Sequence, residues 1–330
     1  MPTQLPRPHI VALDGRTLNP GDLSWNKLKA LGHLTVYEFS KADEVCQRAK
    51  EAEILLANKV ILDAAQLAKL PKLRCICVTA TGYNNVDLKA AGRRGIPVCN
   101  AVGYGSDSVA QHVFALLLAL TNRVQAHHDS VQQGRWGAID DFCYTLTSIP
   151  ELAGKTMGIY GFGRIGQKVA QIAQAFGMEV IATHKHPDRD AAPGVEFVSL
   201  KTLFERSDVV SLHAPLSNEN KGIVNASLLA GMKPTAYLIN TGRGGLIDEP
   251  ALKLALQSAQ LAGAALDVLS VEPPKHGNVL LDAPNCLITP HMAWATREAR
   301  QRLLDITVEN VSAFLRGEPI NVVNTVGNRQ

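Results

Sequence analysis

Residues 159–166 read IYGFGRIG, an apolar run that passes into a Gly-x-Gly-x-x-Gly turn. A stretch with helical periodicity, Gln167 to Phe176, follows at once. In such a strand–turn–helix unit Gly161 allows a tight turn, Gly163 lets a pyrophosphate approach the backbone at the helix N-terminus, and Gly166 lets helix and strand pack closely. Glycine turns also serve packing alone, but the strand before this turn and the helix after it favour a dinucleotide-binding domain.

The length and composition indicate a globular chain with two domains. A chain of 330 residues exceeds the size of a typical single core. The formal charge of +3 is spread without a dense Lys/Arg run, which argues against a nucleic-acid partner or an anionic membrane. The stretch closest to a membrane span, Val113 to Leu120, is far shorter than the roughly 20 residues required, and Met1 to His9 lacks the apolar core of a signal peptide.

The six cysteines do not follow the spacing of a metal site. Cys75 and Cys77 lie in the strand-like run Leu73 to Val78, where alternation places both thiols on one face. We expect small buried thiols in a reducing cytoplasm, with no metal and no disulfide.

Apolar β-rich runs alternate with helical runs along the whole chain, which predicts parallel sheets covered by helices on both faces. The predicted strands are His9–Leu13, Ile54–Ala57, Arg74–Val78, Thr156–Tyr160, Glu179–Ala182, Val209–Leu212, Tyr237–Asn240, Gly263–Asp267 and Cys286–Thr289. We expect two Rossmann-like doubly wound domains. The nucleotide-binding domain, 106–296, would be inserted into a discontinuous, flavodoxin-like substrate-binding domain of residues 1–105 and 297–330, with the long helical runs Ser108–Thr121 and Ala295–Leu315 joining them.

Three side chains of different chemistry follow three successive predicted strands: Arg243, Glu272 and His291. The carboxyl ends of parallel strands meet at one edge of a sheet, so these groups are candidates for a common site. Singly, each also fits a simpler interpretation: a solvated loop cation, a surface carboxylate and a hydrogen-bonded loop histidine.

The chain resembles the D-isomer-specific 2-hydroxyacid dehydrogenase family over nearly its whole length. The matching segments are Ala80–Asp87, Gly105–Leu118, Leu152–Gly177, Leu212–Leu216, Ile239–Asp248, Ala265–Pro273 and Thr289–Trp294. The stretches ATGYNNVDL, SDSVAQHVFALLLALTN and DFCY (141–144) are most similar to the branch of glycerate dehydrogenases and hydroxypyruvate reductases.

The resemblance implies a role for each catalytic candidate. His291 would be the general acid/base that protonates a carbonyl oxygen as hydride arrives, and Glu272 would orient its ring and favour the imidazolium. Arg243 would bind the substrate carboxylate, together with His291 and the backbone amides around Thr81 and Gly82. Glu272 also argues against a formate dehydrogenase, whose pattern lacks a carboxylate there.

The resemblance also implies the cofactor contacts, which surround the glycine-rich turn and the carboxyl ends of the following strands. The candidate cofactor-binding residues are Ser106, Gly161, Phe162, Gly163, Arg164, Ile165, Gly166, His184, Lys185, His213, Ala214, Pro215, Thr241, Gly242, Asp267 and Ala293. Asp267 is expected at the nicotinamide carboxamide, whereas Pro215 fits a turn former equally well.

One departure from the family pattern concerns the cofactor. Sites that prefer NAD place an acid about 20 residues beyond the glycines, where it binds the ribose 2′-hydroxyl. Here His184 stands at that position, Lys185 follows, and the first carboxylate along the chain is Asp188. We therefore expect NADP(H) to be favoured over NAD(H), although simply exposed histidines would allow both.

The resemblance implies reduction of hydroxypyruvate to D-glycerate and of glyoxylate to glycolate, in the cytoplasm and by a homodimer built on the nucleotide-binding domains. Two alternatives stay open. One is a dehydrogenase of another D-2-hydroxy acid, such as a lactate-like substrate. The other is a dinucleotide-sensing binding protein of the corepressor kind, which would bind the cofactor without turnover.

Overall fold

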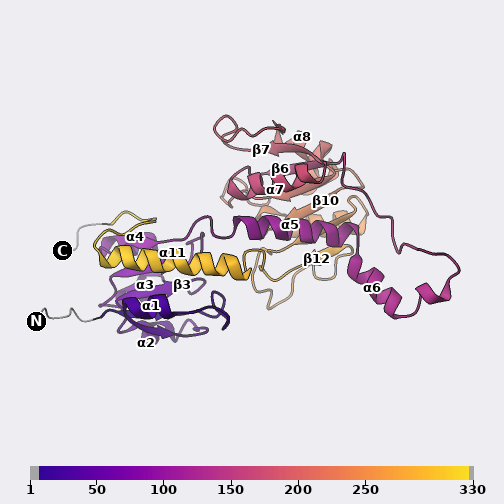
Figure 1. Ribbon diagram of the computed structural model, residues 1–330. Helices are drawn as coiled ribbons and strands as arrows, with labels where there is room; N and C mark the ends of the chain where they lie inside the picture. Colours follow the sequence, from indigo (N-terminus) through magenta and orange to yellow (C-terminus); the bar gives the residue numbers. More distant parts are fainter. Residues whose placement is uncertain (1–6, 327–330) are drawn as a thin grey trace, which may run out of the picture. The chain divides into compact units, whose positions relative to one another are not determined.

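A computed structural model describes residues 7–326 of the chain. The chain divides into two compact units. The first combines the residues up to Gly105 with those from Ala295 onward, and the second is the continuous segment Ser106–Trp294, which holds the glycine-rich turn. Figure 1 traces both units along the chain.

Within the described residues, the first unit contains a five-stranded parallel sheet in the order β2-β1-β3-β4-β5. This is the flavodoxin-like strand order. Its elements are β1 (His9–Ala12), α1 (Asn26–Leu31), β2 (His33–Val36), α2 (Val45–Ala49), β3 (Ile54–Ala57), α3 (Ala64–Ala68), β4 (Cys75–Val78), α4 (Leu88–Arg93), β5 (Val98–Cys99) and α11 (Arg297–Leu315). Every residue of β3 and β4 is buried, as expected for strands covered on both faces.

The C-terminal helix α11 belongs to the first unit because its polar side chains bind N-terminal segments. The guanidinium of Arg300, only 8% exposed, donates to both carboxylate oxygens of Asp22 at 2.6 and 2.7 Å. Near the other end of the helix, Asn310 donates to the carbonyl of Asn100 at 2.9 Å. A buried charge is stable only when it is paired, so these contacts hold two distant parts of the chain together.

The second unit contains, in its described residues, a seven-stranded parallel sheet in the order β12-β11-β10-β9-β6-β7-β8. Its elements are α5 (Ser106–Thr121), α6 (Val124–Gln132), η1 (Trp136–Ala138), β6 (Thr156–Tyr160), α7 (Arg164–Ala175), β7 (Glu179–Thr183), β8 (Val195–Phe197), α8 (Leu200–Arg206), β9 (Val209–Leu212), α9 (Ala226–Ala230), β10 (Tyr237–Asn240), η2 (Gly244–Leu246), α10 (Glu249–Gln257), β11 (Gly263–Leu266) and β12 (Cys286–Ile288). The strand order reverses between β6 and β9, which is where doubly wound sheets bind their ligands.

Two hydrophobic cores cover the two faces of this sheet, and neighbouring residues of β10 alternate between them. Leu238 packs in the core that includes α8, α9 and α10, while Ile239 packs in the core that includes α5 and α7. The predicted fold class is confirmed. The edge strands β2, β5 and β8 were not predicted from the sequence, because β2 and β8 bury no residue and β5 has only two residues.

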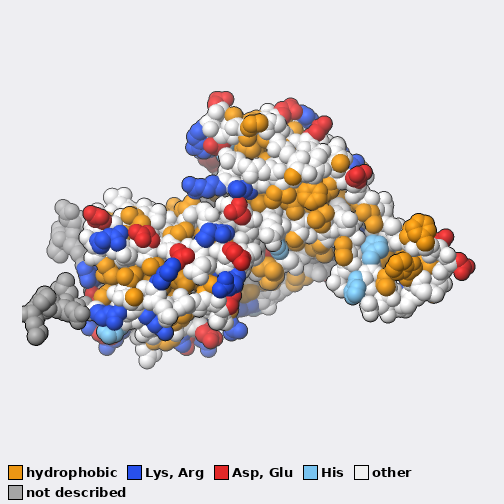
Figure 2. Space-filling view, in the orientation of Figure 1, with side chains coloured by type: hydrophobic (Ala, Val, Ile, Leu, Met, Phe, Trp, Pro, Cys, Tyr) orange, Lys and Arg blue, Asp and Glu red, His pale blue; other side chains and the backbone are white. Residues whose placement is uncertain are grey.

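An arm, residues 122–151, projects from the second unit through α6 and η1 (Figure 1). It exposes large apolar side chains: Phe142 is 88% exposed and Trp136 51%. Figure 2 shows hydrophobic side chains on the surface of the arm. None of the helices in residues 7–326 has the length and apolar character needed to cross a membrane.

Candidate active site

The three glycines of the turn after β6 differ in what a side chain at each position would meet. Gly161 has a φ of +97°, and a Cβ there would lie 2.4 Å from the backbone nitrogen of Ala214. A Cβ on Gly166 would lie 2.4 Å from the carbonyl oxygen of Gly161. A Cβ on Gly163 would meet no atom of the described chain within 4 Å. The turn is thus packed at its first and last glycine and open at the middle one.

The open glycine is also the N-cap of α7. Gly163 has no side chain with which to cap the helix, so the N–H groups of Arg164 and Ile165 receive no side-chain acceptor from the cap. These groups and the helix dipole favour an anion at this end of the helix. The Phe162 side chain is fully buried and packs edge-on against Phe197, so it contributes to the core.

His184, at the end of β7, is held on both ring nitrogens. Its Nδ1 accepts the N–H of Phe162 at 3.1 Å, and its Nε2 lies 2.6 Å from Oδ2 of Asp190. The hydrogen bond from Arg189, followed by that from His184, lowers the pKa of Asp190 to about 2. The expectation that this position lacks an anion is therefore wrong, because the chain after β7 folds back and returns the Asp190 carboxylate to His184.

The cations at the same place are solvent-exposed. The Lys185 side chain is exposed, and Arg189 donates to Asp190 at 2.6 Å while remaining 67% exposed. The sequence reasoning missed both Arg189 and Asp190. Their spacing from His184 carries no motif, and only the turn between β7 and β8 brings them together.

Two buried polar atoms at the carboxyl ends of the adjacent strands β9 and β10 find no hydrogen-bond partner among the described residues: Nδ1 of His213 and Oγ1 of Thr241. Burial lowers the pKa of His213 to about 3, which keeps the ring neutral, and its Nε2 pairs with Oγ of Ser211 at 2.8 Å. An unsatisfied buried polar group costs roughly 1–3 kcal/mol. Together with the open Gly163 and the uncapped helix, these atoms fit a dinucleotide that supplies the missing partners.

His291 and Glu272 form a direct pair after β12 and β11. Nδ1 of His291 lies 2.6 Å from Oε2 of Glu272, and the two side chains are 28% and 30% exposed. Oε1 of Glu272 accepts the N–H of Leu269 at 2.9 Å, which fixes the carboxylate. With Nδ1 engaged, Nε2 is the ring nitrogen left for proton transfer.

The loop that carries His291 is organised by Asp267, which is 1% exposed. One carboxylate oxygen accepts the N–H of Met292 at 2.9 Å, and the other accepts the N–H of Ala293 at 2.8 Å. The N–H of His291 donates to the Asp267 carbonyl at 2.8 Å, and His291 itself has a φ of +53°. Asp267 and the buried Ala293 therefore shape this loop directly.

Arg243 follows β10 and is exposed. Its loop is fixed by Asn240, whose amide donates to the Arg243 carbonyl at 2.9 Å. A Cβ on Gly244 would lie 1.9 Å from the carbonyl carbon of Leu269, so the Arg243 loop is in direct contact with the segment that binds Glu272. The loops bearing Arg243, Glu272 and His291 thus lie at the carboxyl ends of the adjacent strands β10, β11 and β12.

The remaining predicted residues are distributed over both units. Thr81 and Gly82 lie in the first unit, in the turn after β4, where Oγ1 of Thr81 donates to the Ala101 carbonyl at 2.8 Å. Ser106 is the first residue of α5 in the second unit. Ala214 and Pro215 follow β9, and Gly242 donates its N–H to the Asn240 side chain at 3.0 Å.

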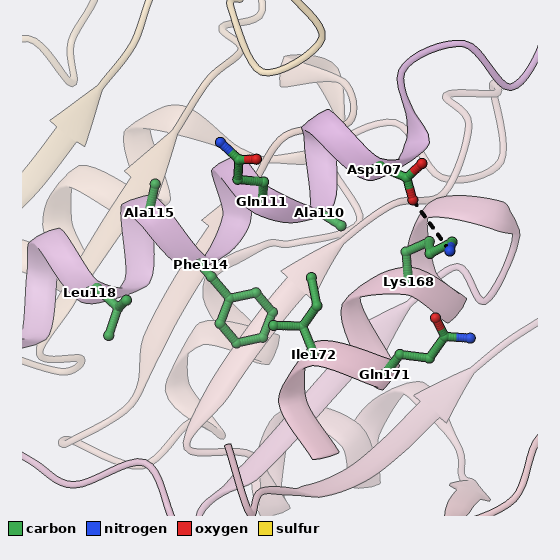
Figure 3. Close-up of a pocket in the computed structure, with 9 residues that line it drawn as sticks. All are labelled: Asp107, Ala110, Gln111, Phe114, Ala115, Leu118, Lys168, Gln171 and Ile172. Carbon is green, nitrogen blue, oxygen red and sulfur yellow. Dashed lines mark ion pairs between the residues drawn. The ribbon is translucent and has the colours of Figure 1, made fainter. Parts of the chain in front are cut away.

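A separate hollow of about 610 Å³ lies between α5 and α7. Figure 3 shows Phe114 and Ile172 facing one another within it, and the ion pair between Lys168 and Asp107, 3.3 Å, at one end. The three catalytic candidates do not line it. It is an apolar surface feature of the helical face, distinct from the strand ends described above.

The cysteines are free thiols. Cys75 and Cys77 are buried on one face of β4 with their sulfur atoms 3.9 Å apart, as predicted. The fold adds Cys99 from the neighbouring strand β5, where it pairs in register with Cys77. The three sulfur atoms lie within 4.8 Å of one another in the core of the first unit.

Comparison with known proteins agrees with this architecture. The family model for the NAD-binding domain of D-isomer-specific 2-hydroxyacid dehydrogenases matches residues 114–293. The chain is 46% identical over 320 residues to the hydroxypyruvate reductase of Blautia hydrogenotrophica, covering 96% of this chain and 99% of that protein. It is 44% identical over 283 residues to the glycerate dehydrogenase of Methylorubrum extorquens, covering 85% and 88%.

A solved structure shares the same fold over nearly the full length. The NADPH-dependent glyoxylate/hydroxypyruvate reductase of Sinorhizobium meliloti superimposes with a TM-score of 0.80 at 29% identity, covering 98% of this chain and 99% of that one. With the glycine-rich turn, the two parallel sheets and the relatives in agreement, the chain belongs to the D-isomer-specific 2-hydroxyacid dehydrogenase family of oxidoreductases.

Proposed function

We propose that this protein reduces hydroxypyruvate and glyoxylate to D-glycerate and glycolate with a reduced nicotinamide dinucleotide. The observation that carries the proposal is the 2.6 Å pair of His291 and Glu272, together with the contact between the segment that binds Glu272 and the loop of Arg243. The two relatives of highest identity described above are named for the same chemistry.

In the reducing direction, Nε2 of His291 gives its proton to the carbonyl oxygen of the keto acid. Glu272 stays bonded to Nδ1, so its negative charge stabilises the imidazolium before the transfer and holds the ring in one orientation. When bound, a reduced nicotinamide would provide the hydride that the carbonyl carbon requires. One proton and one hydride thus convert the ketone to a secondary alcohol, and His291 regains a proton from solvent.

The exposed guanidinium of Arg243 binds the substrate carboxylate. Its planar fork matches two carboxylate oxygens, and its positive charge polarises the neighbouring carbonyl. We propose that the backbone amides around Thr81 and Gly82 also bind the substrate, so that the first unit would be the substrate-binding domain and the second the nucleotide-binding domain.

The dinucleotide is held by the features that fit it. The N-terminus of α7 would hold the pyrophosphate, and Nδ1 of His213 and Oγ1 of Thr241, which lack a partner among the described residues, would hydrogen-bond to the cofactor. We propose NADP(H) as the preferred form. The support is the exposed cation Lys185, while the negative charge of Asp190 is already offset by its two hydrogen bonds from Arg189.

A second copy of this chain is the proposed occupant of the apolar surface of the second unit. The arm exposes Phe142, Trp136 and Val124, at 88%, 51% and 70%. The hollow between α5 and α7 combines apolar side chains, Phe114 and Ile172 among them, with polar groups. Figure 2 shows hydrophobic groups on both surfaces. A two-fold dimer in which each arm covers the partner would bury them. Sedimentation of wild type should give a dimer, and Phe142→Glu a monomer.

The reaction is tested with a panel of keto acids and both cofactors, following the loss of reduced nicotinamide absorbance. Hydroxypyruvate and glyoxylate should have the highest kcat/KM, above pyruvate and aromatic keto acids. Saturable cofactor binding without oxidation across the panel would instead indicate a dinucleotide-sensing protein. The free thiols fit a reducing compartment, and a cytoplasmic location is part of the proposal.

A further inference from the structure

The position of His291 depends on a short loop of unusual conformation. Its φ of +53° is uncommon for a residue with a side chain, and such a conformation persists only when the surroundings hold it. The surroundings here are the Asp267 side chain, which accepts the N–H groups of the two residues after His291. What holds Asp267 therefore also holds the proton donor.

Asp267 is a buried carboxylate, and a buried charge needs several donors to be stable. Besides the two backbone N–H groups it accepts the hydroxyl of Thr289 at 2.6 Å on Oδ1. On the same side, Nε2 of His112 lies 3.6 Å from Oδ1 and 3.1 Å from Oγ1 of Thr289.

The direction of these hydrogen bonds can be deduced. Thr289 has one hydroxyl proton, and that proton is donated to Asp267. The contact between His112 and Thr289 therefore requires Nε2–H of His112 to donate to Oγ1. The result is a chain from His112 through Thr289 to Asp267, in which every donor points toward the carboxylate.

His112 lies in the sixteen-residue helix α5, far in sequence from the loop that it reaches. The helix is packed in the core of the second unit through Val113, Phe114 and Leu117. The chain thus connects a rigid helix to a strained loop.

We propose that His112 is a positioning residue for the reaction: through Thr289 and Asp267 it fixes the loop that presents His291. The inference rests on the proposed function, because its kinetic test measures the reduction of a keto acid. It does not require His112 to touch substrate or cofactor.

The test compares three single variants and one double variant by kinetics. His112→Leu removes the donor at similar size, and His112→Gln restores an N–H near the place of Nε2. We expect His112→Leu to lower kcat roughly 10- to 100-fold, as displaced catalytic groups do, with the keto-acid KM and the NADPH Kd within twofold. His112→Gln should recover most of kcat. Thr289→Val should match His112→Leu, and the double variant should lose no more than either single one.

A second readout needs no turnover. Hydrogen exchange at the amides of Met292 and Ala293 should be about tenfold faster in His112→Leu than in wild type, since local opening raises exchange. His33→Leu, at an exposed histidine of β2, is the matched control and should change nothing.

The inference would be overturned if kcat were unchanged in His112→Leu, or if His112→Gln lowered kcat as much as His112→Leu does. It would also be overturned if the losses of kcat multiplied in the double variant, or if hydrogen exchange at Met292 and Ala293 did not change. If wild type reduces no keto acid, the proposed function fails, while the exchange experiment still decides whether His112 holds the loop.

Discussion

Oε2 of Glu272 lies 2.6 Å from Nδ1 of His291, while Oε1 of the same carboxylate accepts the backbone N–H of Leu269. The carboxylate is therefore held from one side and holds the imidazole from the other. Leu269 in turn packs against Gly244, next to Arg243. One short segment after β11 thus connects the groups that the proposed reaction requires.

Replacing His291 by Ala should lower kcat by roughly 10²–10⁴, the usual contribution of a general acid. The affinity for the dinucleotide should stay within about twofold, since the proposed phosphate contacts come from α7. Steady-state kinetics and a cofactor titration measure both. Turnover within twofold of wild type would show that another group delivers the proton.

Replacing Glu272 by Gln keeps the shape of the side chain but removes its negative charge. The positive charge that His291 carries as proton donor then loses its neighbouring anion, so kcat should fall roughly 10-fold, as expected when a charged hydrogen bond becomes a neutral one. Steady-state kinetics measure this. Glu219→Gln, at an exposed loop residue, is the control. A kcat within twofold of wild type would contradict the role of the pair.

Replacing Arg243 by Lys keeps the positive charge but loses the planar fork. Loss of one charge-assisted hydrogen bond costs about 1.5–3 kcal/mol, so kcat/KM should fall roughly 10- to 100-fold. We expect both a higher KM and a lower kcat, because the same group binds the carboxylate and polarises the carbonyl. A change in KM alone would limit Arg243 to binding.

Wild type should have a higher kcat/KM with NADPH than with NADH. Lys185→Ala should lower kcat/KM with NADPH about 3- to 10-fold and leave kcat/KM with NADH unchanged, because it removes one exposed charged contact to a phosphate. Lys201→Ala, at an exposed lysine of α8, is the matched control. A tenfold preference of wild type for NADH would refute the assignment of the cofactor.

His213 should make the cofactor-free protein less stable in acid. Its pKa is lowered to about 3 in the fold, against roughly 6.5 in an unfolded chain. Between these values the unfolded state binds a proton that the folded state does not. The free energy of unfolding therefore falls as pH drops below 6.5, by about 1 kcal/mol near pH 5.5.

Thermal unfolding at pH 7.5 and 5.5 measures this loss. His213→Gln, which keeps a partner for Ser211, should lose less stability on acidification than wild type. His276→Gln, at an exposed histidine of the same unit, should behave as wild type. Equal acid sensitivity of the His213 variant would contradict the account.

The sequence was sufficient to predict the features that a short continuous stretch of residues determines. The glycine-rich turn could be recognised because its strand, its three glycines and its helix follow one another in the chain, and the alternation of Cys75 and Cys77 follows from the geometry of one strand. The fold class followed from the rhythm of strands and helices. The edge strands β5 and β8 were not predicted, because β5 has only two residues and β8 buries none.

Contacts between residues of separate turns could be found only in the tertiary structure. Asp190 returns to His184 although the chain pattern suggested a site without an anion, and His112 reaches Thr289 from a helix more than 170 residues away. Cys99 joins Cys75 and Cys77 only through strand pairing. Periodicity records which face of an element is buried, whereas the partner across that face is decided by packing and by where buried charges find their donors.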